Sequence, residues 1–315
     1  MTNLKRDRID GDNDNDNEGL NNKKQKLVDC RLPSHFIELH SESFIEACNH
    51  VLEVDPTLLP ILTAGNFSQY LKSDQSIGTC KDHNNNNNNN NTVDLQECFS
   101  KLANAIIGQQ ISNRAARSIR ERLYNYFDGQ FPAFKTLYDS LQDPIIRKEI
   151  KSCGLSDRKL IYLESLSQYF NERIKEIETL FTLDTNDYEN DQRIIDHLVK
   201  NIKGIGPWTA SMFLITGLKR QNVFTADDLG IARGFSNYIA TRKELLNDLI
   251  ERRISIKRSK IKHKKYKWKI YDNDIIESCA QKFEPHRTLF MFLLWRLSSD
   301  NIEDMVKIQE EFMQN

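Results

Sequence analysis

The sequence predicts an all-α fold. Apolar residues recur at intervals of three and four along many segments, alternation of period two never persists, and no internal repeat indicates a solenoid. The chain has 315 residues, which is enough to bury a sizeable core without disulfide or metal cross-links. Hydrophobic residues make up 39% and charged residues 28%, a balance typical of a globular protein that also carries unfolded polar sequence.

The apolar stripes mark the predicted helices in chain order. They comprise Phe44, Ala47, Cys48 and Val51; Leu102, Ala105 and Ile106; Ala115, Ala116, Ile119 and Leu123; Leu160, Leu163 and Leu166; Ile194, Ile195 and Leu198; and Phe290, Leu293, Leu294 and Leu297. No membrane association is expected, because the longest apolar run, Leu289–Trp295, is too short for a spanning helix and no signal peptide opens the chain.

Two polar segments interrupt the helical pattern. Residues 1–29 are rich in Asn and Asp and offer almost nothing to bury, so we expect a disordered N-terminal arm. Residues 73–92 contain the unbroken asparagine tract Asn84–Asn91, which predicts a second disordered segment. Because helical sequence lies on both sides of it, we interpret 73–92 as an insertion within a domain.

The cysteines and a short basic cluster indicate the subcellular location of the protein. The six cysteines are spaced so widely that no C-x-x-C pair exists, which argues against a zinc ribbon or a cysteine-ligated iron-sulfur cluster. Free thiols of this kind indicate a reducing compartment, cytosolic or nuclear. Lys23, Lys24 and Lys26 could act as a weak import signal, and the nucleus is the expected location.

Positive charge is concentrated in one segment. The net charge of the chain is −1, yet ten Lys or Arg residues and no acid lie between Arg252 and Lys269, with Tyr266 and Trp268 interleaved. This basic segment could contact DNA phosphates as an inserted loop, or it could form a solvated charged face. The sequence leaves both interpretations open.

The segment around Lys203–Ala210 reads as helix, tight turn, helix. Ile194–Val199 predicts the first helix, Gly204 and Gly206 would supply backbone angles closed to other residues, and Pro207 suits the first turn of the next helix. Free N–H groups at a helix N-terminus are a ready site for a DNA phosphate. On its own such a turn is equally typical of a plain connection between two helices.

The residues after this turn make the pattern specific. Asp228, Ile231 and Arg233 come shortly after it, in a spacing that resembles the helix-hairpin-helix DNA glycosylase superfamily, whose hairpin is followed by a loop with an essential aspartate. Further segments resemble the monofunctional 3-methyladenine DNA glycosylases of the yeast and bacterial alkylation-repair type. They are Ile106–Ser112 within 102–122, Gly154–Lys159 followed by Tyr162 and Leu163, and Pro285–Arg287 leading to Trp295, so the resemblance covers most of residues 31–300.

The resemblance implies a two-lobed helix-hairpin-helix glycosylase fold with the active-site cleft between the lobes. Residues 30–72 together with 236–315 would form the terminal-helix lobe, and residues 93–235 the core lobe, with the hairpin at about 194–217. The extra N-terminal β-rich domain of many bacterial relatives is expected to be absent.

Two departures from the superfamily refine the expected chemistry. Trp208 stands where relatives that cut the DNA backbone carry a Schiff-base lysine, so no AP-lyase activity is expected. Only Cys279 follows Asp228, which excludes the relatives with a four-cysteine cluster. We therefore expect no metal and no cofactor, although a monovalent cation at the hairpin stays open, and the superfamily implies a monomer.

The resemblance also assigns roles to individual residues. Asp228 would be the catalytic carboxylate; its alternative role is a helix N-cap, for which Asp227 is the better candidate. The expected base pocket consists of Trp208, Trp295, Met212, Leu229 and Phe44, for all of which core packing is the rival role. The expected DNA contacts are Gln109, Gln110, Ile111, Gly204, Ile205, Gly206, Thr209 and Arg233. Gln110 with Ile111 would be the wedge, although Gln110 could be an ordinary turn amide and Ile111 a core residue.

The expected function is the hydrolytic excision of alkylated purines, such as 3-methyladenine and 7-methylguanine, from double-stranded DNA to initiate base excision repair. One alternative keeps the fold and changes the lesion to a mismatched, oxidised or deaminated base. A second alternative is a non-catalytic DNA-binding module, since the hairpin also serves as a phosphate grip. A carboxylate such as Asp228 argues against that module, because it would face an anionic polymer.

Overall fold

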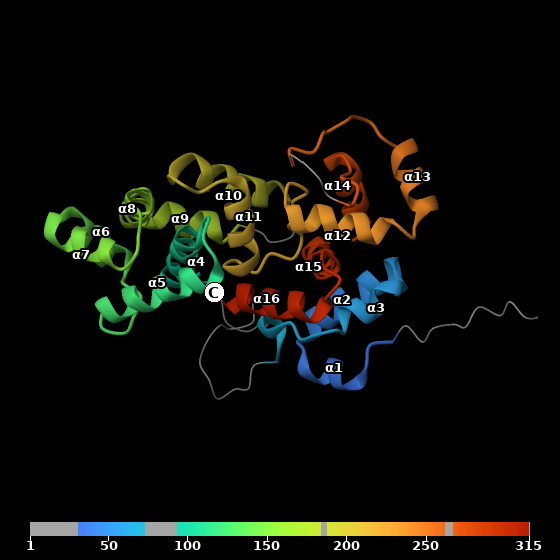
Figure 1. The fold of residues 1–315 in the computed structure, drawn as a ribbon, viewed down its shortest axis with the longest axis horizontal. Coiled ribbons are helices and arrows are strands. Elements are labelled where there is room, and N and C mark those ends of the chain that lie inside the picture. Colours follow the sequence, from blue (N-terminus) through green and yellow to red (C-terminus); the bar gives the residue numbers. More distant parts are fainter. Residues whose placement is uncertain (1–30, 73–92, 184–187, 262–266, 315) are drawn as a thin grey trace, which may run out of the picture. The chain divides into compact units, whose positions relative to one another are not determined.

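The computed structural model describes residues 31–72, 93–183, 188–261 and 267–314, and within these ranges every regular element is a helix (Figure 1). The all-α prediction is confirmed. One isolated antiparallel bridge joins His40 to Leu71. Contacts divide the chain after Arg31, and the compact unit that begins at Leu32 is the one considered below. The predicted disordered segments 1–29 and 73–92 lie outside the described residues.

The helices follow one another with short connections. In chain order they are α1 (Ser34–Leu39), α2 (Glu42–Val54), α3 (Leu59–Leu62), α4 (Leu95–Gly108), α5 (Asn113–Tyr126), α6 (Phe134–Gln142), α7 (Pro144–Ser152), α8 (Asp157–Glu172), α9 (Ile174–Phe181), α10 (Tyr188–Asn201), α11 (Pro207–Thr216), α12 (Leu229–Ile239), α13 (Lys243–Glu251), α14 (Asn273–Gln281), α15 (Arg287–Leu297) and α16 (Ile302–Gln314). Two short 3₁₀ turns, Pro56–Leu58 and Ser68–Tyr70, complete the described elements. None of these helices is both long and apolar enough to cross a membrane.

Side-chain caps fix where several of these helices begin. Asp94 accepts hydrogen bonds from the backbone N–H groups of Gln96 and Glu97 at the start of α4, and Ser112 accepts one from Ala115 at the start of α5. Each cap satisfies a donor that the first helical turn leaves without an intrahelical partner. The predicted stripes lie inside the helices so defined, and most of their members are buried.

Helices α12 and α15 pack against each other in the middle of the core. The backbones approach so closely that a Cβ atom on Gly234 of α12 would lie 1.8 Å from the carbonyl oxygen of Leu294 on α15. Only glycine permits this approach. The crossing brings Asp228, which precedes α12, close to Trp295, which lies near the end of α15.

A buried arginine links α15 to other parts of the fold. The Arg296 side chain is fully buried and donates hydrogen bonds to the carbonyl oxygens of Ile61 and Leu62 and to the Gln309 side chain on α16. Burial lowers the pKa of this guanidinium to about 10, and the bonds compensate for its removal from water. The last two described helices are thereby joined to the segment before residue 73. The assignment of 30–72 with 236–315 and of 93–235 to separate lobes stays a prediction.

Candidate active site

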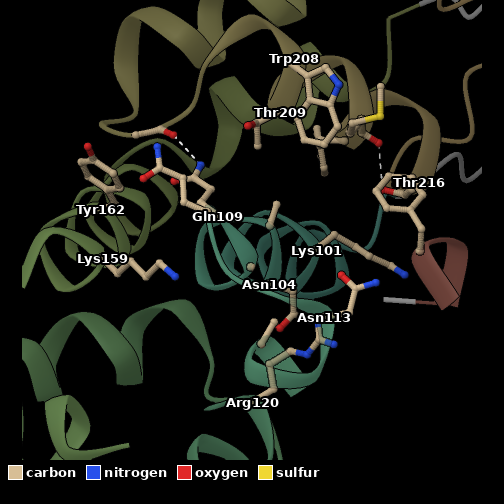
Figure 2. Close-up of a pocket in the computed structure, with 18 of the residues that line it drawn as sticks. Lys101, Asn104, Gln109, Asn113, Arg120, Lys159, Tyr162, Trp208, Thr209 and Thr216 are labelled. Atoms are coloured by element: carbon tan, nitrogen blue, oxygen red, sulfur yellow. Dashed lines mark hydrogen bonds between the residues drawn. The ribbon is translucent and has the colours of Figure 1, made fainter. Parts of the chain in front are cut away.

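The described part of the chain encloses a large cavity with a volume of about 1120 Å³. Its walls come from α4 and α5 with the turn between them, the start of α8, helix α11, and single residues of the hairpin turn, α12 and α15 (Figure 2). Helix α16 completes the lining. Segments far apart in the sequence therefore meet around one space, which is slightly larger than the roughly 300–1,000 Å³ typical of small-ligand pockets.

Asp228 is the N-cap of α12. Its Oδ1 accepts the backbone N–H of Ile231 at 2.9 Å. The expectation that Asp227 would be the better cap was wrong: Asp227 instead accepts a bond from Asn273 at 2.6 Å and lies 3.7 Å from Lys260 Nζ. Capping requires the carboxylate three residues before the capped N–H, and the helix begins at Leu229, which selects Asp228.

Two tryptophans hold the same carboxylate. Trp208 donates its indole N–H to Asp228 Oδ2 at 3.0 Å, and Trp295 donates its own to Asp228 Oδ1 at 2.9 Å. Both indoles line the cavity, with 43% of Trp208 exposed. The three donors, two indoles and one backbone N–H, fix the orientation of a carboxylate that is only half-buried.

Gly230 is a site residue that the sequence did not reveal. A Cβ atom there would lie 3.0 Å from Trp295 Cδ1 and 3.1 Å from Asp228 Oδ1. Any larger residue would crowd the indole and the carboxylate, so glycine keeps the wall of the cavity open at this point.

Three of the five residues predicted for the base pocket line the cavity. Met212 lines the cavity beside Trp208 and Trp295. Leu229 is 46% exposed and is not one of the lining residues. Phe44 is also absent from the lining: it is buried in an aromatic cluster, stacked on Tyr70 with ring centroids 4.4 Å apart. The apolar stripe of α2 thus packs Phe44 in the core, which was its rival role.

The predicted wedge lies in the turn between α4 and α5. Gln110 is exposed and has a left-handed backbone with φ of 57°, and Ile111 is 37% exposed. An exposed Ile111 does not fit the alternative role as a core residue. Gln109 and Gln110 both line the cavity, and the Gln109 side chain donates a 2.8 Å hydrogen bond to the carbonyl oxygen of Gly204.

The predicted helix-hairpin-helix corresponds to α10, its turn and α11. Gly204 has φ of 84°, and the ring of Tyr162 would lie 2.2 Å from a Cβ atom there, so both angle and space require glycine. The same expectation was wrong for Gly206, whose φ of −101° is open to any residue. No atom lies within 4 Å of a Cβ atom built on Gly206. What Gly206 offers is open space at the uncapped N-terminus of α11.

The remaining predicted DNA contacts are more scattered. Thr209 lines the cavity from the first turn of α11, which places it next to the open hairpin turn. The Ile205 side chain is buried, so only its backbone could meet a ligand. Arg233 is half-buried on α12 and is not one of the lining residues.

A polar wall formed by Lys101, Asn104, Arg120 and Lys159 was not predicted. All four line the cavity, as Figure 2 shows. Burial lowers the pKa of Lys159, which donates to the carbonyl oxygen of Ile107 at 2.7 Å, and burial likewise lowers the pKa of Arg120. No local signal in the sequence marks this wall, because Lys101 and Asn104 share α4 with the polar residues Gln96, Glu97 and Ser100.

The described part of the basic segment 252–269 is largely paired with acids. Arg253 lies 2.8 Å from Asp272 and 2.7 Å from Asp274, and further pairs join Lys257 to Glu277 and Arg258 to Asp272. Residues 262–266 lie outside the described ranges. In those ranges, no group of three or more His, Cys, Asp or Glu side chains could hold a metal ion.

The fold and the site define a helix-hairpin-helix protein with an acidic residue held beside a cavity. Residues 103–257 match the HhH-GPD superfamily base excision DNA repair protein family. The chain belongs to this superfamily. The resemblance stated from the sequence, to helix-hairpin-helix DNA glycosylases of the alkylation-repair type, is confirmed.

Individual proteins of known name are also similar to the chain. The chain is 48% identical over 288 residues to a DNA-3-methyladenine glycosylase of Saccharomyces cerevisiae, covering 91% of each protein. It is 31% identical over 145 residues to DNA-3-methyladenine glycosylase 1 of Schizosaccharomyces pombe, covering 46% of this chain and 59% of that protein. The solved structure of an S. pombe 3-methyladenine DNA glycosylase in complex with abasic DNA has a similar fold, with a TM-score of 0.50 and 22% identity over 80% of this chain and 95% of that one.

Proposed function

We propose that this protein excises alkylated purines, with 3-methyladenine and 7-methylguanine as the main lesions, from double-stranded DNA by hydrolysis of the glycosidic bond. The observation that carries the proposal is the Asp228 carboxylate, which is not itself one of the lining residues but is held by the indole N–H groups of Trp208 and Trp295, and both of these line the cavity. The activity of the S. cerevisiae relative named above supports the choice of lesion.

The damaged nucleotide must leave the duplex before it can enter the cavity. Extrusion costs a few kcal/mol of unstacking, and less where damage has weakened the base pair. Gln110 and Ile111 stand exposed at the turn beside the cavity and act as the wedge that fills the gap. The uncapped N-terminus of α11 at Gly206 offers backbone N–H groups to a phosphate, because a helix N-terminus carries partial positive charge.

The indole side of the cavity, rather than its wall of Lys101, Arg120 and Lys159, suits a base that carries positive charge. A purine alkylated at N3 or N7 is cationic, and the faces of indole rings attract cations by about 0.5–2 kcal/mol per contact, more when water is excluded. Trp208 and Trp295 both line the cavity, where their rings can meet such a base. The volume of about 1120 Å³ accommodates the sugar together with the base.

Asp228 acts on the sugar rather than on the base. Because the cationic base departs as a neutral molecule, strong general acid catalysis is unnecessary. The deoxyribose becomes oxocarbenium-like as the bond breaks, and a carboxylate about 4 Å away stabilises that charge by about 4 kcal/mol at an effective dielectric constant of about 20. The same carboxylate can orient the attacking water.

Trp208 occupies the place of the Schiff-base lysine, so the product is an intact abasic strand. We further propose that the protein works in the nucleus, as a monomer and without a cofactor. A cell-fractionation assay, light scattering and activity in EDTA test these three statements. Replacing potassium by a bulky organic cation tests whether a monovalent ion supports the hairpin.

The central test uses one panel of duplexes. Methylated DNA is compared with mismatch, uracil and oxidised-base duplexes, and both released bases and strand cuts are measured, the cuts with and without alkali. We expect free methylpurines and cuts that depend on alkali. Release of uracil or an oxidised base in preference to methylpurines would assign another lesion class, and binding without any release would make the protein a non-catalytic module.

A further inference from the structure

Helix α16 (Ile302–Gln314) is part of the cavity although it lies far from the helix-hairpin-helix in sequence. It contributes Met305, Ile308, Gln309 and Phe312 to the lining. Figure 1 shows the C-terminal end of α16 beside α4 and α5, and an ion pair of 3.6 Å between Arg117 on α5 and Glu311 agrees with this placement. The end of the described chain therefore shapes the proposed substrate site.

Contacts on several sides fix the position of α16. Gln309 accepts a hydrogen bond of 2.8 Å from the buried Arg296, and Glu310 accepts one of 3.0 Å from the backbone N–H of Ser68. Val306 packs so tightly that its Cγ1 would lie 2.2 Å from a Cβ atom on Gly65. These three contacts fix the helix in place. The side chains that it contributes to the cavity therefore have defined positions.

Phe312 on α16 packs against Trp295, one of the two indoles that hold Asp228. Its ring lies edge-on to Trp295, with centroids 5.6 Å apart and an interplanar angle of 79°. Phe292 packs near the same indole with centroids 5.9 Å apart. The Nε1 atom of Trp295 donates to Asp228 Oδ1. A direct chain of contacts thus runs from Phe312 through the indole to the carboxylate.

We infer that Phe312 is a positioning residue for base excision: it fixes the plane of Trp295 and, through the indole N–H, the orientation of Asp228. The inference rests on the proposed function. Perpendicular aromatic pairs have a preferred geometry, and a large cavity borders the indole on its open side. Without the ring at position 312 the indole gains freedom toward that space. Donors and carboxylates that are held in place before the reaction contribute most to catalysis, so this freedom slows the chemical step.

The experiment compares Phe312→Leu with Phe312→Tyr, and uses Lys307→Ala as a control on an exposed position of the same helix. Three quantities are measured: the single-turnover rate of methylpurine release at saturating enzyme, the affinity for DNA, and thermal unfolding. We expect Phe312→Leu to slow release about fivefold to tenfold with DNA affinity unchanged within about twofold, because only transition-state positioning is lost. Phe312→Tyr keeps the ring and should retain at least about half of the rate, and Lys307→Ala should match the wild type.

Several outcomes would overturn the inference. These are release by Phe312→Leu at the wild-type rate, release by Phe312→Tyr as slow as by Phe312→Leu, and a loss of DNA affinity as large as the loss of rate. If Phe312→Leu does not fold, Phe312→Met replaces it with a side chain that adapts to irregular gaps but lacks the ring. A wild-type protein that releases no methylpurine would refute the proposed function instead, which keeps the two failures distinct.

Discussion

The side-chain amide of Gln109 donates a 2.8 Å hydrogen bond to the carbonyl oxygen of Gly204. Gln109 ends α4 beside the proposed wedge, and Gly204 lies in the hairpin turn, so the two elements proposed to contact DNA are joined directly although 95 positions separate these residues. Since the bond lies at the cavity, it should align the wedge with the phosphate site rather than support the fold as a whole.

Replacing Gln109 tests this alignment. Gln109→Ala should weaken DNA binding or slow base release by about threefold to tenfold, because a lost hydrogen bond of this kind corresponds to about 0.5–1.5 kcal/mol. Electrophoretic mobility shift and single-turnover assays measure the effect. Gln96→Ala is the matched control, because Gln96 also donates from its side chain to a backbone oxygen, that of Pro132, at 3.1 Å. Equal effects of the two substitutions would contradict the proposed alignment.

Asp228→Asn should separate catalysis from folding. Asparagine caps helices as well as aspartate does, so the melting temperature should change little. Release of methylpurines should fall about 100-fold to 1000-fold, because the charge that stabilises the sugar is lost, and Asn cannot accept both indole bonds. Asp143→Asn, at the N-cap of α7, makes the same change away from the cavity and should leave release unaltered. Undiminished release by Asp228→Asn would remove this residue from the mechanism.

Two glycines should respond differently to alanine. Gly234→Ala would bring Cβ to 1.8 Å from the Leu294 carbonyl oxygen, which should lower stability by about 1–3 kcal/mol or more. Gly206→Ala meets no atom within 4 Å and has an ordinary φ, so its thermal unfolding should match the wild type. If a phosphate approaches Gly206, the alanine variant should still bind DNA less tightly. Chemical denaturation and DNA titration of both variants check this contrast.

His40 should make stability depend on pH. Burial lowers its pKa below 6.5, although the Nδ1 contact of 2.7 Å with the Phe36 carbonyl oxygen favours the charged form. A lowered folded-state pKa means that the unfolded chain binds the proton more readily, so stability is present above pH 6.5 and is lost as pH falls below it. Urea unfolding at about pH 7.5 and about pH 5.5 measures this loss, and His40→Gln should reduce the difference. An unchanged difference would assign the pH dependence to other groups.

The periodicity of apolar residues predicted the helical class and the stripes of α2, α5 and α15, because burial of one helix face leaves a direct signature in sequence. Which of two adjacent acids caps α12 could not be predicted, since it depends on where the helix starts. The polar wall and helix α16 were missed for a related reason. A cavity is created by segments distant in sequence, and nothing in the local pattern around Lys101 or Phe312 states which neighbours will surround them.

The ion pairs in the described part of the basic segment affect how the protein meets undamaged DNA. Because Arg253, Lys257 and Arg258 are paired with nearby carboxylates, these three side chains exert little long-range attraction on a polyanion. Their contribution to encounters with undamaged duplex, and to the dependence of those encounters on ionic strength, should therefore be small. How long the protein stays bound would then depend on short-range contacts, that is, on whether a nucleotide leaves the base stack and fits beside Trp208 and Trp295.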